Sequence, residues 1–122
     1  MKNLKNTEKI NARFAATLKL LDEYVGSHKN IAKLVVFGPS VENDAYINSE
    51  EAEVYLAMYF TEEVVKHFTD SDFSQETCSL EREIPYVLTY AMQNDLALKK
   101  NSKLKDDVNK GVVIYDCKEP IS

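Results

Sequence analysis

The stretch VVFGPSVENDAYINSEEAEVYLAMYF, Val35–Phe60, overlaps two apolar runs that predict the central strands of the fold. The first run, KLVVFG at 33–38, is compact and ends in glycine, which is typical of a buried strand that leads into a turn. In the second run, EVYLAMYF at 53–60, both alternating faces are apolar or aromatic. A strand with two apolar faces is expected to be central and covered on each side.

A helix is predicted before these strands. Its apolar residues recur at steps of three and four, which places them on one face of a helix that starts near Asn6 or Thr7 and stops at Gly26. They are Ile10, Phe14, Leu18, Leu21 and Val25. The polar opening MKNLKN, 1–6, is expected to be frayed.

The segment after the second strand is predicted to be partly helical. TEEVVKHF, 61–68, predicts a short helix with Thr61 as its cap. The polar stretch 69–83 is expected to hold a loop or a partial helix, with a turn at DSD, Asp70–Asp72.

Two more strands are predicted in the last third of the chain. IPYVLTYA, 84–91, is rich in strand formers, and Pro85 belongs at its beginning or on an edge because proline has no N–H to donate. A charged segment then predicts a helix ended by Gly111 and a last strand, VVIYDC. The order of elements predicts an α/β or α+β domain with one mixed sheet of about four strands and helices packed on it.

Composition limits the partners and the compartment. The 122 residues are expected to form one domain over 1–122, with 44% hydrophobic and 29% charged residues as in ordinary soluble proteins. A formal charge of −5 provides no field for a phosphate polymer or an anionic membrane, so neither nucleic acid nor a membrane is expected as a partner. Cys78 and Cys117 have no metal or redox spacing, and no secretory signal or spanning run is present, so a cytoplasmic protein is expected.

Four residues of the opening stretch form the candidate site. Gly38 permits close backbone approach where the first strand ends, and the Ser40 hydroxyl can donate to a phosphate oxygen. Glu51 and Glu53 alternate with Ala52, so both carboxylates are expected on one side of the second strand. Two such acids, together with the oxygens of a nucleoside triphosphate, are what Mg²⁺ needs.

These residues resemble the small nucleotidyltransferases of the polymerase-β-like superfamily, which carry a glycine and serine, ten intervening residues and an acid-x-acid pair. Here Ser40 is followed by ten residues, 41–50, before Glu51-Ala52-Glu53. The resemblance covers about 10–117. It implies a nucleotidyltransferase-like fold, phosphate binding by Gly38 and Ser40, and Mg²⁺ binding and catalysis by Glu51 and Glu53. It also implies a helical protein partner, as for the antitoxin members of the family. Separately, the tyrosines on the apolar-aromatic strand are typical of an interface, so a homodimer is the other expected partner.

The sequence also departs from the family pattern. Pro39 separates the glycine from the serine and removes one N–H that could bind phosphate, and Asp44 stands where a second glycine is expected. Glutamates replace both aspartates, which moves each carboxylate by about an ångström, and such a displacement costs about a hundredfold in rate. The family's third acid is expected on the next strand, and IPYVLTYA contains none; Glu83 precedes it.

Three hypotheses follow. The first is a degenerate, catalytically weak or inactive nucleotidyltransferase-like domain that binds a protein partner or a nucleotide. The second is an active Mg²⁺-dependent enzyme that transfers a nucleoside monophosphate from a nucleoside triphosphate to a hydroxyl. The third is an unrelated α/β oligomerisation or binding module, in which Gly38 and Pro39 are only a turn and Glu51 and Glu53 only the solvated start of a strand.

Overall fold

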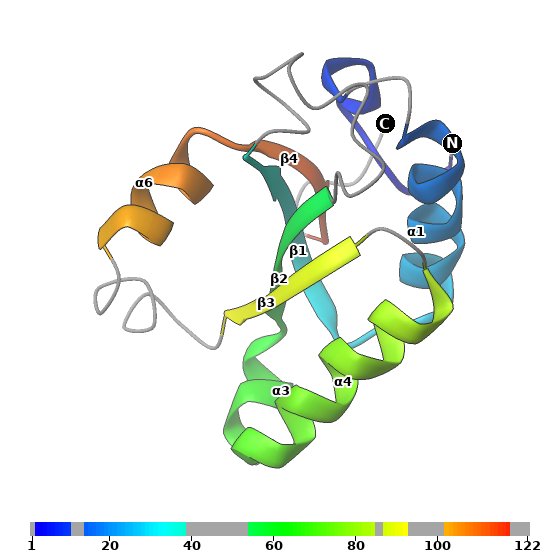
Figure 1. The fold of residues 1–122 in the computed structure, drawn as a ribbon. Coiled ribbons are helices and arrows are strands. Elements are labelled where there is room, and N and C mark those ends of the chain that lie inside the picture. Colours follow the sequence, from blue (N-terminus) through cyan, green and yellow to red (C-terminus); the bar gives the residue numbers. More distant parts are fainter. Residues whose placement is uncertain (1, 11–13, 39–53, 85–86, 93–101, 118–122) are drawn as a thin grey trace.

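The elements lie along the chain in an order close to the predicted one. The structure is a computed structural model that describes residues 2–10, 14–38, 54–84, 87–92 and 102–117. Its elements are η1 (Thr7–Lys9), α1 (Ala15–Ser27), β1 (Ile31–Phe37), β2 (Val54–Phe60), α3 (Glu62–His67), α4 (Asp70–Glu83), β3 (Val87–Met92), α6 (Ser102–Asn109) and β4 (Val112–Asp116). Figure 1 shows their arrangement.

The strands form one mixed sheet in the order β3-β2-β1-β4. β1 pairs antiparallel with β2 and with β4, whereas β2 pairs parallel with β3. This confirms the predicted α+β class with a mixed four-stranded sheet, and it confirms that β2 is a central strand.

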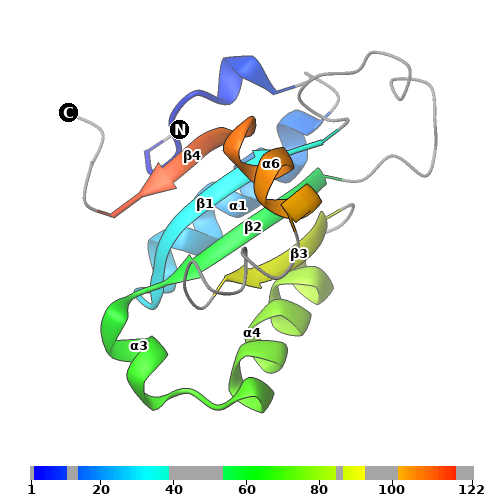
Figure 2. The ribbon, with the colours of Figure 1, turned by 90° about the vertical axis from the view of Figure 1, so that its left-hand side faces the viewer.

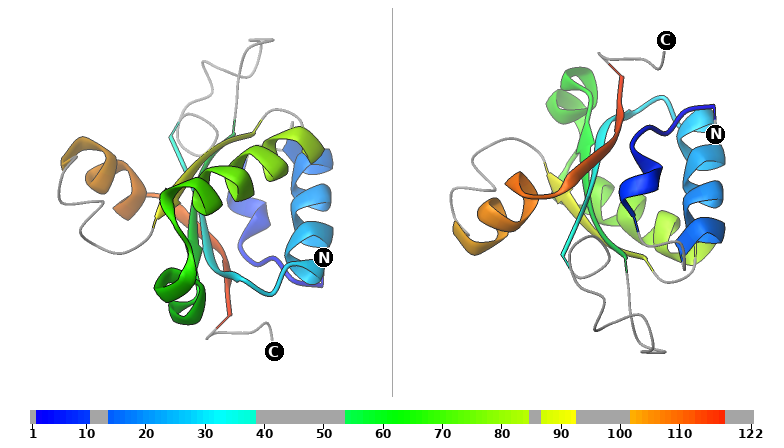
Figure 3. Two further views of the ribbon diagram at one scale, coloured as in Figure 1. Left: turned by 90° about the horizontal axis from the view of Figure 1, so that it is seen from below. Right: turned by 90° about the horizontal axis from the view of Figure 1, so that it is seen from above.

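Helices cover both faces of the sheet, so the described elements form three layers. α1 and α4 lie on one face and α6 on the other, as Figures 2 and 3 show. The alternation along the strands explains this: Leu34 and Leu56 belong to the core shared with α1 and α4, whereas Val35 and Ala57 pack with Val108 of α6. No helix in the described ranges is long and apolar enough to cross a membrane.

The N-terminal segment contacts the fold, contrary to the expectation that residues 1–6 are frayed. The buried Asp22 carboxylate of α1 accepts hydrogen bonds from the backbone N–H of Asn3, at 2.7 Å, and of Leu4, at 2.9 Å. Leu4 is buried in the core beside α1. The N–H of Lys5 then donates to the carbonyl of Ile114 at 2.7 Å, so this segment covers the outer edge of β4.

At the opposite edge of the sheet, a side chain bonds one backbone N–H. β3 is the outer strand there, and the N–H of Thr89 donates to Oε1 of Glu81 on α4 at 2.7 Å. Because unpaired strand edges favour association with other chains, these contacts at β4 and β3 limit edge-to-edge pairing.

The first helix starts later than predicted. Thr7–Lys9 form a 3-10 turn, Ile10 is extended, and α1 begins at Ala15. Ile10 and Phe14 nevertheless lie in the core with the α1 residues, so their apolar character reflects burial and not helix periodicity. The helix also continues one residue past Gly26, to Ser27, whose Oγ donates to the carbonyls of Glu23 and Tyr24, each at 3.2 Å.

The stretch expected to be a loop or partial helix is a complete helix, α4. Thr69 Oγ1 accepts from the N–H of Asp72, and the Asp72 carboxylate accepts from the N–H of Thr69, which is a capping box. Asp70–Asp72 are therefore the first helical turn and not a separate turn, which corrects the prediction. The preceding helix, α3, has Thr61 as its N-cap residue, but that side chain makes no capping hydrogen bond.

Candidate functional site

The candidate site was predicted where the first strand ends, and four strand ends meet at this edge of the sheet. Phe37, the last residue of β1, lies opposite Tyr55 of β2. Val36 lies opposite Val112, the first residue of β4, and Val54 lies opposite Val87, the first residue of β3. The end of β1 is therefore next to the starts of β2 and β4, and the start of β3 follows beside β2.

Gly38 is the predicted site residue that the structure describes. Its φ of +80° lies in the left-handed region, and a Cβ there would be 2.7 Å from Cδ2 of Tyr55. Backbone conformation and the Tyr55 ring thus each require glycine at this position. One side of the turn is covered by this ring.

Ser40, Glu51 and Glu53 lie outside the described residues, as do Pro39 and Asp44. The predicted Mg²⁺ ligands stay predictions for that reason. Within the described ranges, no group of three or more His, Cys, Asp or Glu side chains could hold a metal ion.

Gly111 has a second role at this edge that the sequence did not indicate. It was predicted only to end a helix, and it does follow α6 directly before β4. A Cβ at Gly111 would lie 2.6 Å from the carbonyl oxygen of Val36 and 2.8 Å from Cγ1 of Val35. The backbone therefore passes close against the end of β1, a contact between segments far apart in sequence.

Aromatic side chains line the α6 side of the sheet beside the Gly38 turn. The Phe37 ring centroid lies 5.9 Å from that of Tyr55 and 5.7 Å from that of Tyr90. Further along the same face, the Lys33 ammonium lies 5.5 Å from the Tyr59 ring centroid, within cation–π range. Tyr90 is 36% exposed. The α6 side of the sheet therefore has both a buried aromatic ring, Phe37, and an exposed phenol, Tyr90.

β3 contains no acid, as the sequence indicated. Its residues Val87–Met92 pair in parallel register with β2, so Leu88 lies opposite Tyr55 and Thr89 opposite Leu56. Glu83, the acid that precedes this strand, ends α4. Its carboxylate is close to Tyr24 of α1, on the face opposite α6. Glu83 thus faces the α1 side and not the aromatic side of the sheet.

The histidines and cysteines show no catalytic arrangement in the described part of the chain. The His28 ring stacks on Tyr24 with centroids 3.8 Å apart, and its Nδ1 donates to the Tyr24 carbonyl at 2.8 Å. This contact ends α1 and is structural. His67 is exposed at the end of α3, and Cys78 and Cys117 are exposed free thiols.

Comparison with known proteins gives no relative. No known protein family matches this sequence, and neither a curated protein nor a solved structure matches it.

Proposed function

We propose that this protein is a nucleotidyltransferase-like domain that lacks the full catalytic set and acts by binding a protein partner or, weakly, a nucleotide. The observation that carries the proposal is β3, which pairs in parallel with β2 and has no acid among Val87–Met92. The resemblance implies a carboxylate on this strand that activates the attacking hydroxyl. A domain that has this strand but not its carboxylate retains a surface for binding. It lacks the general base that would activate the hydroxyl.

The surroundings of Gly38 support the proposal that the domain does not transfer a nucleoside monophosphate. The Tyr55 ring lies so close to Gly38 that it fills the space on one side of the glycine. Transfer needs the triphosphate and the attacking hydroxyl to be held to within about an ångström. A turn that is packed against an aromatic ring on one side leaves less room for both groups.

The tyrosines on the α6 side of the sheet are suited to a protein partner. Tyrosine offers a large apolar surface with one polar group, and it is enriched in the residues that dominate protein interfaces. Tyr90 is exposed, and its ring contacts Phe37 near the Gly38 turn. A helical partner, which the resemblance implies, or a second copy of the chain would bind over Tyr90.

A labelling assay combined with a pull-down tests the proposal. Incubation with Mg²⁺, labelled nucleoside triphosphates and cell extract is expected to label no target, whereas the tagged protein is expected to recover a stoichiometric partner. Tyr90→Ala should weaken that recovery by about tenfold or more, as truncation of an interface anchor does. The matched control is Leu20→Ala, because Leu20 is also exposed, at 38%, and lies on α1 on the other face of the sheet.

The alternative is an active transferase, which the pairing of β1 with β2 favours. This pairing places Gly38 beside the start of the strand that Glu51 and Glu53 precede in sequence. In this alternative Glu51 and Glu53 hold Mg²⁺, and Gly38 and Ser40 position the phosphates. The same assay would then label a target, and Glu51→Gln with Glu53→Gln would abolish the label. Labelling that persists in the double variant would exclude those metal ligands.

A further inference from the structure

Residues 2–6 form a strap along the outer edge of β4. The right-hand view of Figure 3 shows this segment running between α1 and β4. The backbone N–H of Lys5 donates to the carbonyl of Ile114 at 2.7 Å, and Nδ2 of Asn6 donates to the carbonyl of Val113 at 3.0 Å. Two donors of the strap thus bind two carbonyls of the edge strand.

The edge that the strap covers is suited to pairing with another strand. Asp116 lies opposite Lys33 of β1, and the next residue, Cys117, donates its N–H to the carbonyl of Ala32 at 2.8 Å. In an antiparallel ladder this pattern makes Asp116 and Lys33 a non-hydrogen-bonded pair, so the N–H and C=O of Asp116 point away from β1. They lie on the same outer side as the carbonyl of Ile114, where a further strand would bind.

Most of the bonds that hold the strap come from α1 and not from β4. The buried Asp22 carboxylate accepts from the N–H groups of Asn3 and Leu4, and Nδ2 of Asn3 donates to the Asp22 carbonyl at 2.9 Å. The Leu4 side chain is also buried in the core beside α1. Because these anchors lie on α1, the strap can be released without breaking any hydrogen bond between the strands of the sheet.

The sequence of β4 is compatible with pairing to a second copy of itself. In an antiparallel pair centred on Ile114, Val113 of one chain lies opposite Tyr115 of the other, and Val112 lies opposite Asp116. A β-branched residue opposite an aromatic residue is a favourable cross-strand pair, and the two Asp116 carboxylates do not face each other. Such a pair has twofold symmetry, so the same edge serves both chains.

An irregularity in β4 limits the strength of this pairing. Tyr115 lies opposite Leu34 and Val113 opposite Val35, so Ile114 is one extra residue between them. Such a bulge bends the strand and shortens its regular ladder. A strand of five residues with a bulge is expected to form only a weak dimer, with a dissociation constant on the order of 100 µM.

We propose that the strap is an autoinhibitory contact, which occupies the β4 edge and prevents antiparallel pairing with β4 of a second copy. Release of the strap exposes the edge and allows this dimer to form. The contact is separate from partner binding over Tyr90, because Tyr90 belongs to β3 at the other edge of the sheet.

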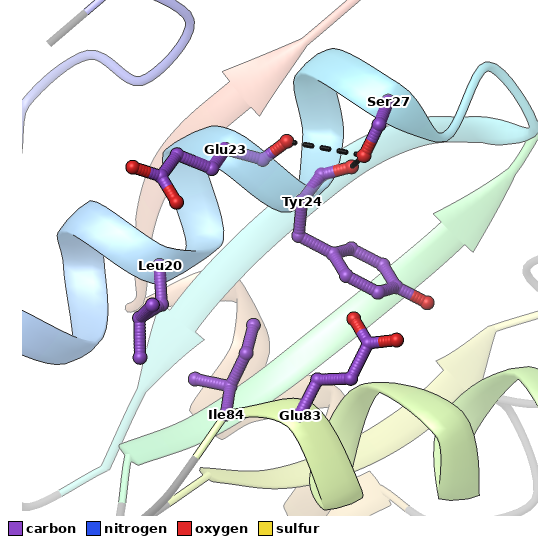
Figure 4. Close-up of a pocket in the computed structure, with 6 residues that line it drawn as sticks. All are labelled: Leu20, Glu23, Tyr24, Ser27, Glu83 and Ile84. Carbon is purple, nitrogen blue, oxygen red and sulfur yellow. Dashed lines mark hydrogen bonds between the residues drawn. The ribbon is translucent and has the colours of Figure 1, made fainter.

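Sedimentation equilibrium of the full chain tests the proposal, at protein concentrations from about 10 µM to about 1 mM. Asp22→Asn combined with Asn6→Gly removes the anchor and one donor to β4, and glycine suits the φ of 58° at position 6. The dimer association constant of this variant should exceed that of the wild type about tenfold or more. Glu23→Gln is the matched control and should equal the wild type, because Glu23 adjoins Asp22 but lines the pocket between the ends of α1 and α4 (Figure 4).

Hydrogen exchange distinguishes release of the strap from unfolding. In the combined variant the amides of Asn3 and Leu4 should exchange faster, while that of Leu56, buried in the central strand β2, stays protected. Asn6→Gly alone keeps the Asp22 anchor and should raise association about two- to fivefold, so the test also holds if the combined variant loses protection of the core. Asn3 and Leu4 amides that stay protected in the combined variant would overturn the assigned anchor.

A proline on β4 tests where the chains meet. Asp116→Pro removes an N–H that points away from β1, so in the combined variant it should return association to the wild-type level while the sheet is retained. Association that persists with this proline would place the contact elsewhere and overturn the proposal. A released strap without increased association would overturn it as well.

Discussion

At position 38 of the candidate site, the need for glycine can be measured directly as a change in unfolding free energy. Gly38→Ala should lower the free energy of unfolding by about 1–3 kcal/mol, because the new Cβ opposes both the positive φ and the Tyr55 ring. Gly38→Asn carries the same Cβ but tolerates the left-handed region better, so it should lose less. Urea denaturation measures both. Equal stability of Gly38→Ala and the wild type would contradict the described turn.

The raised pKa of Tyr24 predicts that the free energy of unfolding decreases at alkaline pH. Its pKa is raised above the ordinary 10.0 in the folded state, mainly by burial, so above that pH the unfolded chain releases this proton more readily than the folded one. The free energy of unfolding is therefore unaffected by this group below about pH 9 and decreases as the pH rises through its folded pKa.

Tyr24→Phe should thus lose less stability than the wild type between about pH 9 and pH 11 in urea denaturation. Burial also raises the pKa of Tyr115, with Cys117 and Asp116 adding to it, so Tyr115→Phe should act in the same direction. Tyr90→Phe, at an exposed position, is the control and should follow the wild type. Parallel loss in Tyr24→Phe and the wild type would contradict the prediction.

At the scale of elements, the two threonine caps form a matched pair. Thr69 closes a capping box on α4, whereas Thr61 begins α3 without a side-chain hydrogen bond. Thr69→Ala should cost about 1 kcal/mol of unfolding free energy and Thr61→Ala clearly less. Urea denaturation of both variants compares them, and an equal cost would contradict the role assigned to the Thr69 side chain.

The helix α4 shows why apolar periodicity alone did not predict every helix. Only Phe73 and Leu80 of this helix are buried, so its apolar pattern was too sparse to indicate a helix. The signal that could have found it is Thr69-x-x-Asp72, the capping box. At the N-terminus, periodicity instead predicted too long a helix. Ile10 and Phe14 match the helical spacing and are buried, but α1 begins after them.

The N-terminal segment depends on Asp22. This carboxylate accepts from the N–H groups of Asn3 and Leu4, and bonds to a charged acceptor contribute about 1.5–3 kcal/mol. Asp22→Asn should therefore lower the unfolding free energy by about 2 kcal/mol and increase hydrogen exchange at those two amides. Glu23→Gln, one residue away and exposed, should do neither. Unchanged exchange in Asp22→Asn would show that the segment is held by other contacts.

For the whole molecule, the sheet was the most predictable part. Strand alternation has a period of two, so the faces of β2 could be assigned from Val54 and Tyr55 onward, and the mixed four-stranded α+β class followed from element order. The Gly38 turn and the acid-free β3 are local features and could also be predicted. The contacts of Gly38 with Tyr55 and of Gly111 with Val36 depend on strand register, which local patterns do not determine.

The proposed function depends on whether the domain holds a nucleoside triphosphate tightly enough for transfer. A ligand present at a hundred times its dissociation constant stabilises a protein by about 2.7 kcal/mol, and each kcal/mol raises the melting temperature of a domain of this size by about 3–5 °C. Tight Mg²⁺-dependent binding would therefore raise it by about 10 °C.

The most direct measurement is a thermal-shift series with Mg²⁺ and each of several nucleoside triphosphates, with Glu51→Gln plus Glu53→Gln as the control variant. We expect a rise of no more than about 2 °C with every nucleotide, the same in the wild type and the double variant. A rise of about 10 °C that requires Mg²⁺ and disappears in the double variant would contradict it and establish a working nucleotide site.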